Sequence, residues 1–445
     1  MANIKQKSKS KGKQIKLTEG QAIALDSVLK FLANRSDRTY ALFGYAGVGK
    51  TFLTKLIIEH CHKKDLKVVL AAPTNKAAKV LSQTTGEEAI TIAKMLGLRP
   101  KIDQTTGKEI YTRDPDAKTI NLENYDLVIL DETSMIGSEL MTLLSEQLTL
   151  FSAKFLFLGD PAQLPPVGEE KSPVFAQIQQ YAKLTEVVRH SGAILNWATA
   201  LRRESDIAPI RKFTDNETLI VLKEQQFSEL LLETFTSKEF KKVANYCRIL
   251  AWTNACVARW NQKIRNAIFG KNALRFMPGE RLIAIAACTS RERDSKNPSS
   301  NNYTETVILS SSGEVEVLET HQEKGIVEYG LFQRDMFQYW LINAQDEEGA
   351  LKQFRVLDTT EETRVKKMLQ SYAQQKQWDN YWGLKRAFHP LDYAYALTVH
   401  RSQGSTFQRV FLDFRNLMMN RKLEERKKLL YTAATRASQQ MIVLD

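Results

Sequence analysis

The feature that most constrains the fold is a repeated order of apolar strand, polar turn and amphipathic helix between Leu17 and about Arg189. The strands read TYALFG, KVVLAAP, YDLVILDE and AKFLFLGD, and the helical segments TNKAAKVL and SMIGSELMTLL follow the second and third of them. Apolar strands that alternate with helices indicate a parallel sheet covered on both faces. Such folds bind ligands in loops at the carboxyl ends of their strands.

A phosphate-binding loop follows the first of these strands. Residues 44–51 read GYAGVGKT, which fits G-x-x-x-x-G-K-[ST], and they open a helix. In that context backbone N–H groups cradle phosphates beside the positive end of the helix, the lysine pairs with the β- and γ-phosphates, and the threonine ligates Mg²⁺. A fortuitous glycine-rich turn is the alternative. The expected nucleotide-binding residues are Gly44, Ala46, Gly47, Val48, Gly49, Lys50 and Thr51.

Two adjacent carboxylates, Asp131 and Glu132, end the apolar strand VIL. We expect Asp131 to hold Mg²⁺, directly or through water, and Glu132 to take a proton from an attacking water molecule. Paired acids at a strand end can also be solvated turn residues, but a phosphate loop in the same sheet favours the catalytic interpretation. These motifs indicate nucleotide hydrolysis and leave its purpose open.

The rest of the chain divides into further segments. A polar piece over 98–122, with a turn at Thr106–Gly107, predicts a hairpin insert. The strand-then-helix pattern returns at YCRILAWTN and again at ALTVHRSQGS, RVFLDF and MIVLD, while 275–357 reads as short alternating strands. The expected organisation is a basic tail (1–16), a first α/β domain (17–190), a second α/β domain (191–274 with 387–445), and a β-rich, SH3-like insert with a helical segment (275–386).

Composition narrows the partner and the compartment. A net charge of +12 and a pI of about 9.3 are compatible with nucleic acid, because neutralised phosphates release counterions. The lysine-rich tail has no apolar core behind it, so it is not a secretory signal. Cys61, Cys247, Cys256 and Cys288 form no C-x-x-C pair, which favours buried thiols in a reducing cytosol over zinc or disulfides.

Several motifs occur together in one order. They are LTEGQ, the phosphate loop, AAPTNKAAKVL, VILDETSM, FLGDPAQLPPVG, LTEVVRH, ALTVHRSQGSTFQRVFLD and YTAATRAS. As a set they resemble the superfamily 1 helicases, more narrowly the RecD-like branch and its small Dda-type phage members. The resemblance covers nearly the whole chain and implies two RecA-like α/β domains with ATP–Mg²⁺ in the cleft between them.

The resemblance also implies roles at the nucleotide. Gln21 should read the adenine edge, and Gln163 should sense the γ-phosphate. Arg189 and Arg436 resemble the two arginines that reach the γ-phosphate, the second from the other motor domain. Gln403 and Gly404 resemble the family's bridge between nucleotide and strand.

The same resemblance implies strand contacts. Thr74 and Asn75 start a helix after a proline, where N–H groups and hydroxyls suit a phosphate. The expected strand-binding residues are Thr74, Asn75, Thr91, Thr398, His400 and Ser405; for His400 a structural, hydrogen-bonded role is the alternative. The family often has T-x-H where this chain reads Thr91-Ile92-Ala93, so one contact is in doubt. Trp252, Tyr303 and Trp340 fit cores better than base stacking.

By resemblance, the expected function is ATP-dependent, 5′-to-3′ translocation on single-stranded DNA with unwinding of duplex at forks. The expected setting is a cytoplasmic monomer that works beside single-stranded-DNA-binding or replisome proteins. A helicase-like translocase that needs a partner is one alternative. A non-motor nucleotide switch is the other, and it leaves the Gln403 and Arg436 motifs without a purpose.

Overall fold

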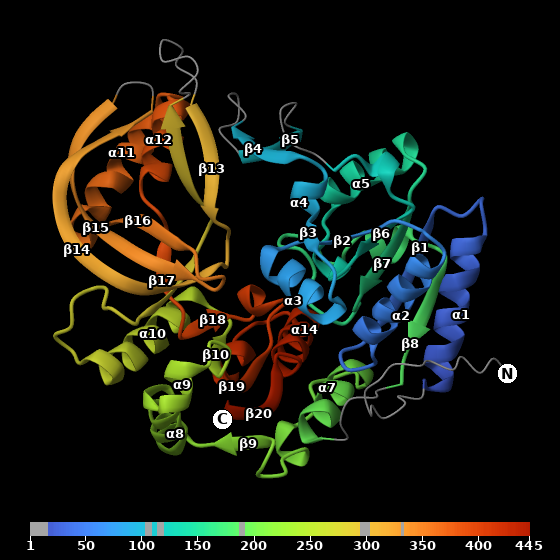
Figure 1. Ribbon diagram of the computed structural model, residues 1–445. Coiled ribbons are helices and arrows are strands. Elements are labelled where there is room, and N and C mark those ends of the chain that lie inside the picture. Colours follow the sequence, from blue (N-terminus) through green and yellow to red (C-terminus); the bar gives the residue numbers. More distant parts are fainter. Residues whose placement is uncertain (1–16, 103–108, 114–119, 187–191, 294–302, 331–332) are drawn as a thin grey trace.

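The computed structural model describes residues 17–102, 109–113, 120–186, 192–293, 303–330 and 333–445. The predicted tail, the turn at Thr106–Gly107 and Arg189 lie outside the described residues. Two parallel sheets and one antiparallel sheet form the body of the molecule (Figure 1). The prediction of two RecA-like α/β units is confirmed by these two parallel sheets.

The first parallel sheet has the strand order β3-β2-β6-β7-β1-β8. Alternate residues of each strand point to opposite faces, so the sheet buries two separate apolar clusters. One cluster lies under α1, α2 and α3, and the other lies under α4 and α5. The elements are α1 (Glu19–Ala33), β1 (Thr39–Gly44), α2 (Lys50–Lys63), β2 (Val68–Ala72), α3 (Asn75–Thr85), β3 (Ala89–Thr91), α4 (Ile92–Met95), β6 (Leu127–Leu130), α5 (Ser138–Leu150), β7 (Lys154–Gly159) and β8 (Tyr181–Leu184).

A hairpin leaves this sheet between α4 and β6. Its strands β4 (Leu98–Ile102) and β5 (Glu109–Arg113) pair in antiparallel register, with Leu98 opposite Arg113. In Figure 1 the hairpin projects away from the first sheet. The strands therefore lie within the predicted insert over 98–122.

The second parallel sheet has the order β18-β10-β19-β20-β9. Helices α8 and α10 cover one face, and α7, α13 and α14 cover the other. The elements are α7 (Ala193–Arg203), β9 (Leu219–Leu222), α8 (Glu224–Thr236), β10 (Cys247–Ala251), α10 (Asn254–Phe269), β18 (Ala396–Thr398), β19 (Phe407–Asp413), α13 (Phe414–Met418), α14 (Leu423–Ala434) and β20 (Ala437–Leu444).

The third sheet is antiparallel, in the order β16-β15-β14-β11-β17, and it curves around two helices (Figure 1). Its strands are β11 (Arg281–Ala284), β14 (Glu314–Tyr329), β15 (Gln333–Asp346), β16 (Leu351–Leu357) and β17 (Leu391–Tyr393); the helices are α11 (Glu362–Gln374) and α12 (Trp378–Ala387). A separate ribbon joins β12 (Cys288–Arg293) to β13 (Tyr303–Leu309). The SH3-like description of this insert stays a prediction.

Two expectations about the insert are wrong. The strands predicted to be short over 275–357 include one of 16 residues, β14, which pairs along its length with the 14 residues of β15. The boundary at 387 also moves, because β17 pairs with β11 of the antiparallel sheet and not with the second parallel sheet.

Short elements complete the described chain: α6 (Val174–Gln177), α9 (Lys238–Lys242), η1 (Leu122–Asn124), η2 (Thr133–Met135), η3 (Ile210–Lys212), η4 (Thr359–Glu361) and η5 (His400–Ser402). All four cysteines are buried free thiols, as predicted. Across the described ranges, every helix is too short or too polar to cross a membrane.

Candidate functional site

The loop between β1 and α2 has the geometry that a phosphate cradle needs. Gly47 and Gly49 have φ values of +79° and +87°, in the left-handed region that glycine adopts without strain. A Cβ on Gly44 would come within 2.8 Å of Val48 Cγ2. The glycines therefore allow both the curvature of the loop and its close packing, at the positive end of a 14-residue helix.

Lys50 opens α2 and turns its side chain back over this loop. Its Nζ atom donates to the carbonyl oxygens of Gly44 and Tyr45 at 2.5 and 3.1 Å. The Lys50 ammonium group therefore lies at the opening of the phosphate-binding loop. When a nucleotide binds, it can donate to phosphate oxygens in place of these two carbonyl oxygens. Thr51 follows on the first turn of the helix, half-buried beside it.

The predicted acid pair lies at the carboxyl end of β6, the second strand along from β1 in the sheet. The Glu132 N–H donates to Asp131 Oδ1 at 2.8 Å, and Glu132 has a left-handed backbone with φ of +50°. Burial and the neighbouring Glu132 carboxylate raise the pKa of Asp131 to about 6, against the opposing charge of Lys50. A hard oxygen donor set with excess negative charge fits Mg²⁺, so Asp131 and Thr51 could hold this cation.

The second parallel sheet reaches into the same site through Tyr431 of α14. Its hydroxyl accepts from the Ala46 N–H at 3.1 Å and donates to Asp160 Oδ2 at 2.6 Å. Tyr431 and Asp160 are both almost completely buried. One hydroxyl therefore connects the phosphate loop, the carboxyl end of β7 and the second motor unit.

Arg436 follows α14 and is also buried, 5% exposed. Its guanidinium donates to the carbonyl oxygens of Thr432 and Ser405 at 3.2 and 3.1 Å. Burial lowers the pKa of this guanidinium, and the nearby charge of Glu132 partly restores it. The arginine is thus held by hydrogen bonds within its own domain, at a distance where the charge of Glu132 in the other domain still acts on it.

Gln163 and Gln403 lie on opposite sides of the contact between the two motor units. Gln403 Nε2 donates to the carbonyl oxygen of Leu164 at 3.0 Å, and the Leu164 N–H donates to Thr432 Oγ1 at 3.2 Å. Gly404 has φ of +73°, and a Cβ there would lie 3.2 Å from the Cβ of Ala77. Gln163 is 5% exposed, and its Oε1 has no hydrogen-bond partner within the described ranges.

Gln21 is placed beside the loop but is already engaged. Its Nε2 donates to the Val48 carbonyl at 2.9 Å, and its Oε1 accepts from the Thr18 N–H in a capping box at the start of α1. The Gln21 side chain therefore links the start of α1 to the phosphate loop and stabilises the loop's conformation. A role at the adenine edge stays a prediction.

The expected strand contacts of the first unit cap helices. Thr74 Oγ1 accepts from the Ala77 N–H at the start of α3, and Thr91 Oγ1 accepts from the Lys94 N–H at the start of α4. Asn75 is the first residue of α3 and is exposed. Both helices begin at the carboxyl edge of the sheet, which is the edge of the phosphate loop.

The expected strand contacts of the second unit differ in accessibility. Thr398 ends β18 and is 7% exposed, whereas Ser405 is 1% exposed. Burial lowers the pKa of the His400 imidazole, so this side chain is neutral at neutral pH. The structure brings Thr398, His400 and Ser405 into one loop with Gln403; their strand contacts stay predictions.

Sequence reasoning missed Asp160, Tyr431 and Arg202. Asp160 follows β7 as Asp131 follows β6, and this repeated signal of an acid after an apolar strand could have found it. Tyr431 stands in the motif YTAATRAS but carried no assigned role. Arg202, on α7, lies 3.4 Å from the centroid of the Tyr45 ring, and no local pattern points to that contact.

Two family models match the chain. An AAA domain model matches residues 16–224, and a UvrD-like helicase C-terminal domain model matches residues 393–444. The matched ranges contain the phosphate loop and Arg436, respectively.

Similar proteins cover most of the chain. An uncharacterised protein of Acanthamoeba polyphaga mimivirus is 23% identical over 95% of this chain and 98% of its own length. The ATP-dependent DNA helicase dda of Enterobacteria phage T4 is 26% identical over 94% of this chain and 97% of its own length. The ATP-dependent RecD2 DNA helicase of Deinococcus radiodurans is 35% identical over 39% of this chain and 22% of its own length.

Solved structures share the fold. A Pif1 helicase from a study of unwinding at forked DNA matches with a TM-score of 0.52 and 16% identity, over 97% of this chain and 92% of that one. Bacteroides Pif1 with ADP-AlF3 and single-stranded DNA matches with a TM-score of 0.51 and 15% identity, over the same shares. With its two parallel sheets, its phosphate loop and both family matches, the chain is similar to superfamily 1 DNA helicases of the RecD/Pif1-like branch, and it is an ATP-hydrolysing enzyme.

Proposed function

We propose that this helicase translocates on single-stranded DNA in the 5′-to-3′ direction and separates duplex at a fork. The observation that carries the proposal is the shared nucleotide site. The Tyr431 hydroxyl of the second motor unit accepts from the Ala46 N–H of the first, and the Glu132 charge of the first unit affects the pKa of the buried Arg436 of the second. Hydrolysis then depends on how the two units meet, and that dependence couples chemistry to movement.

In the proposed reaction, ATP lies on the phosphate loop with Lys50 at its β- and γ-phosphates. Glu132 takes the proton of the attacking water. Arg436, together with Arg189, which lies outside the described residues, stabilises charge on the γ-phosphate; comparable arginines contribute about 10³–10⁵ in rate. Mg²⁺ held by Thr51 and Asp131 would neutralise charge on the phosphate oxygens.

The coupling runs through the residues between the two sheets. Gln163 follows Asp160 by three positions and has an unused amide oxygen, so it suits a sensor of the γ-phosphate. Gln403 donates to Leu164, the residue after Gln163, and Gly404 packs closely against Ala77 of helix α3. A change at the phosphate thereby reaches the loop that contains Thr398 and His400.

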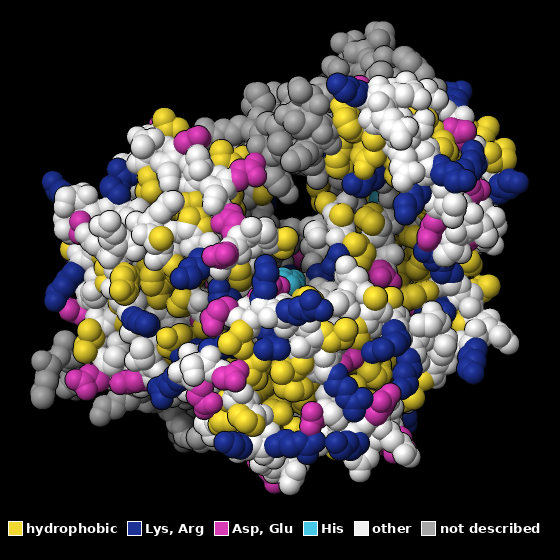
Figure 2. All heavy atoms as spheres, turned by 180° about the vertical axis from the view of Figure 1, so that it is seen from behind, with side chains coloured by type: hydrophobic (Ala, Val, Ile, Leu, Met, Phe, Trp, Pro, Cys, Tyr) yellow, Lys and Arg dark blue, Asp and Glu magenta, His cyan; other side chains and the backbone are white. Residues whose placement is uncertain are grey.

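The strand is proposed to pass between the two parallel sheets and the antiparallel sheet. Figure 2 shows that the face behind Figure 1 is hollowed between the first sheet and the antiparallel sheet, with Lys and Arg side chains gathered below the hollow. The hairpin of β4 and β5 would act as a wedge at the fork, and the antiparallel sheet would hold the strand. Alternating closure and opening of the cleft would advance the protein along it.

The test is steady-state ATP hydrolysis with and without single-stranded DNA, single-stranded RNA and blunt duplex DNA. It is followed by strand separation on forks with either a 5′ or a 3′ loading tail. We expect strong stimulation by single-stranded DNA that falls as salt rises, and unwinding from the 5′ tail.

Each other outcome selects a different function. Stimulation without strand separation would favour a translocase that needs a partner. Hydrolysis that no nucleic acid changes would favour a nucleotide switch and overturn the motor. Unwinding from the 3′ tail would overturn the direction alone.

A further inference from the structure

The Arg436 guanidinium uses most of its hydrogen-bond donors on oxygen atoms of its own domain. Its Nε atom donates to the Thr432 carbonyl at 3.2 Å, Nη1 donates to the Ser405 carbonyl at 3.1 Å, and Nη2 donates to Thr435 Oγ1 at 3.0 Å. A guanidinium has five N–H donors, and these bonds occupy three of them. Arg436 must therefore exchange some of these bonds before it can act fully on a γ-phosphate.

The Thr435 hydroxyl is oriented to accept from this arginine. Thr435 Oγ1 donates its proton to the Thr432 carbonyl at 2.8 Å. A hydroxyl has one proton and two lone pairs, so its lone pairs stay free to accept from Arg436 Nη2. A side chain without an oxygen atom at this position would lose the bond to the guanidinium altogether.

The C-terminal end of α14 attracts the same guanidinium. Thr432 lies in the last turn of this 12-residue helix, and Thr435 is its C-cap. The carbonyl groups of a last turn lack partners within the helix and carry partial negative charge, which favours a cation. The helix end therefore adds to the three hydrogen bonds that hold Arg436 in its own domain.

These neutral oxygens do not neutralise the charge of Arg436. Within the described ranges no carboxylate forms an ion pair with this arginine, although its side chain is 5% exposed. The charge of Glu132 acts on it from further away and only partly offsets the lowering of its pKa by burial. A phosphate oxygen would be a stronger partner than a carbonyl or a hydroxyl, so a γ-phosphate in the cleft can compete for this side chain.

The backbone of Arg436 is fixed at both of its polar groups. Its N–H donates to the Ala433 carbonyl at 3.1 Å, and its carbonyl accepts from the Phe407 N–H at 2.8 Å. An exchange of partners therefore requires movement of the side chain and not of the backbone.

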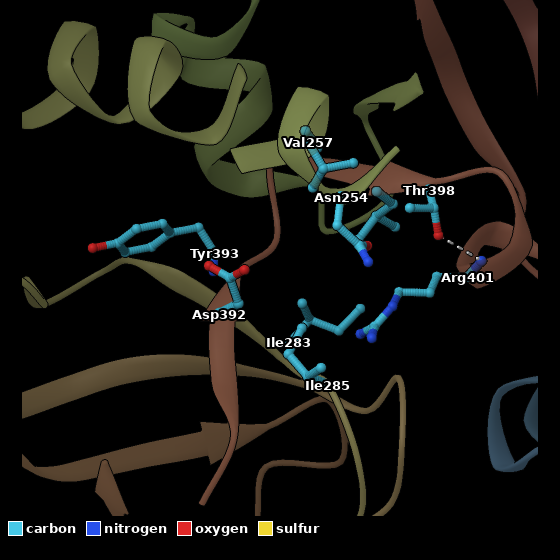
Figure 3. Close-up of a pocket in the computed structure, with 10 residues that line it drawn as sticks. Asn254, Val257, Ile283, Ile285, Asp392, Tyr393, Thr398 and Arg401 are labelled. Carbon is cyan, nitrogen blue, oxygen red and sulfur yellow. Dashed lines mark hydrogen bonds between the residues drawn. The ribbon is translucent and has the colours of Figure 1, made fainter. Parts of the chain in front are cut away.

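One of the three bonds depends on how the two motor units meet. The Ser405 carbonyl belongs to the loop that starts at Thr398, where the Arg401 N–H lies 3.4 Å from Thr398 Oγ1 (Figure 3). Gln403 of this loop donates to the Leu164 carbonyl of the first unit at 3.0 Å. Movement of the first unit against the second would therefore displace the Ser405 carbonyl and weaken the hold on the arginine.

We propose that Thr435 is a positioning residue that holds Arg436 away from the γ-phosphate, together with the carbonyls of Thr432 and Ser405. This hold keeps ATP hydrolysis slow until the contact between the two motor units changes. The inference rests on the proposed function, because it takes Arg436 as the arginine that acts on the γ-phosphate. Thr435 contributes to the reaction only through Arg436.

The first test is steady-state ATP hydrolysis by Thr435→Val, which keeps the shape of the side chain and removes the hydroxyl. Without nucleic acid the rate should rise by roughly tenfold, the factor that one hydrogen bond to a charged group contributes. The rate with saturating single-stranded DNA should stay at the wild-type value, so the stimulation should fall by the same factor. Thr435→Ser, which keeps the hydroxyl, should restore the slow rate.

The second test compares two ligands by isothermal calorimetry. Mg²⁺–ADP with aluminium fluoride fills the γ-phosphate position, so Thr435→Val should bind it more tightly than the wild type does. Mg²⁺–ADP alone has no group at that position, so its affinity should not change. A general distortion of the site would alter the affinity for both ligands.

A matched control and a double variant isolate the hydroxyl. Thr234 is 3% exposed on α8, and its Oγ1 donates to the Leu230 carbonyl at 2.7 Å, so Thr234→Val removes a similar hydroxyl far from the cleft. This control should hydrolyse ATP at the wild-type rate. In the double variant of Thr435→Val with Arg436→Gln the gain in the basal rate should disappear.

Each outcome decides for or against the hold on Arg436. A basal rate in folded Thr435→Val that is unchanged or lower would overturn it, and so would a gain that persists in the double variant. Thr435→Ala gives the same test if valine prevents folding, which thermal unfolding would show. If wild-type hydrolysis ignores single-stranded DNA, the proposed motor fails, yet a basal gain that Arg436→Gln abolishes still supports the hold. If Arg436→Gln alone hydrolyses ATP normally, the role of Arg436 fails, and the inference fails with it.

Discussion

Replacing Tyr431 by phenylalanine removes one oxygen atom from the centre of the nucleotide site. That hydroxyl accepts from the Ala46 N–H and donates to Asp160. Burial and the Asp160 carboxylate raise the pKa of Tyr431 well above its usual value, so the hydroxyl keeps its proton. The backbone N–H groups of this loop are also those that bind phosphate, so Tyr431 and a bound nucleotide compete for Ala46.

The magnitude follows from which hydrogen bonds change on binding. The bond to Asp160 is absent from the variant with and without nucleotide, so its cost of about 1.5–3 kcal/mol falls on stability and cancels in affinity. The bond to Ala46 exists only before nucleotide binds, and a neutral bond of this kind contributes about 0.5–1.5 kcal/mol. Its loss should tighten nucleotide binding by roughly two- to tenfold, since 1.4 kcal/mol is a factor of about ten.

The assay is an equilibrium titration of Mg²⁺–ADP by isothermal calorimetry in the absence of DNA. Tyr395→Phe is the matched control. That tyrosine is equally buried in the second motor unit, and its hydroxyl bonds to Glu280, away from the cleft. If Tyr431→Phe is folded and binds ADP no more tightly than Tyr395→Phe does, the hydroxyl does not compete with nucleotide, and the reasoning is refuted.

Four further predictions test other parts of the molecule. Lys50→Ala should reduce ATP turnover more than about 100-fold while single-stranded DNA still binds in anisotropy titrations; normal turnover would remove the lysine from the phosphate site. Glu132→Gln should bind nucleotide in calorimetry yet lose about 10²–10⁴ in turnover, the usual contribution of a general base. Replacing residues 103–108 by Asn-Gly should spare strand-stimulated hydrolysis and reduce fork unwinding; equal loss of both would make the hairpin structural. Glu314→Gln should destabilise the protein by about 3–5 kcal/mol, because Arg248 then stays buried without its partner. Burial opposes ionisation of Glu314, but Arg248 and Lys76 bring its pKa down to about 2. Its stabilisation is therefore complete above about pH 4.5 and lost as pH falls toward 2, so the variant's deficit in thermal unfolding should be constant from pH 5 to 9.

The features that could be predicted from the sequence are those formed by residues close together along the chain. The strand, the glycine loop and the helix at Lys50 are contiguous, and Asp131 follows its strand directly, so residue type and period suffice for both. The merged strand β14 was missed because residues 319–324 are polar and mostly exposed. The buried residues of this part of the ribbon, Ile342, Trp340 and Tyr339, lie on the partner strand β15. Residues 319–324 therefore carry no hydrophobic alternation of their own that could mark them as a strand.

Contacts between distant segments could not be predicted in this way. Tyr431 lies 385 residues from Ala46 and 271 from Asp160. The sequence assigned Gln21 to the adenine, yet its amide already bonds to Val48, a partner that only the packing of α1 against the loop reveals. The general rule that ligands bind at the carboxyl ends of parallel strands located the site, but it did not say which side chains of the second unit would fill it.

The loop from Thr398 to Ser405 explains how a small change at a phosphate can reach a strand. Its ends are fixed on one side to β18 and on the other to Arg436, through the Ser405 carbonyl. Between them Gln403 is bonded to the first motor unit, and the buried Arg401 Nη1 atom has no hydrogen-bond partner in the described chain. A ligand shifts an equilibrium only by the difference in its affinity for two states. If closing of the cleft moves Gln403 with Leu164, it also moves the loop that contains Thr398 and His400, so the strand contacts proposed for that loop would differ between the two states of the nucleotide. The same linkage requires a bound strand to change nucleotide affinity by an equal factor.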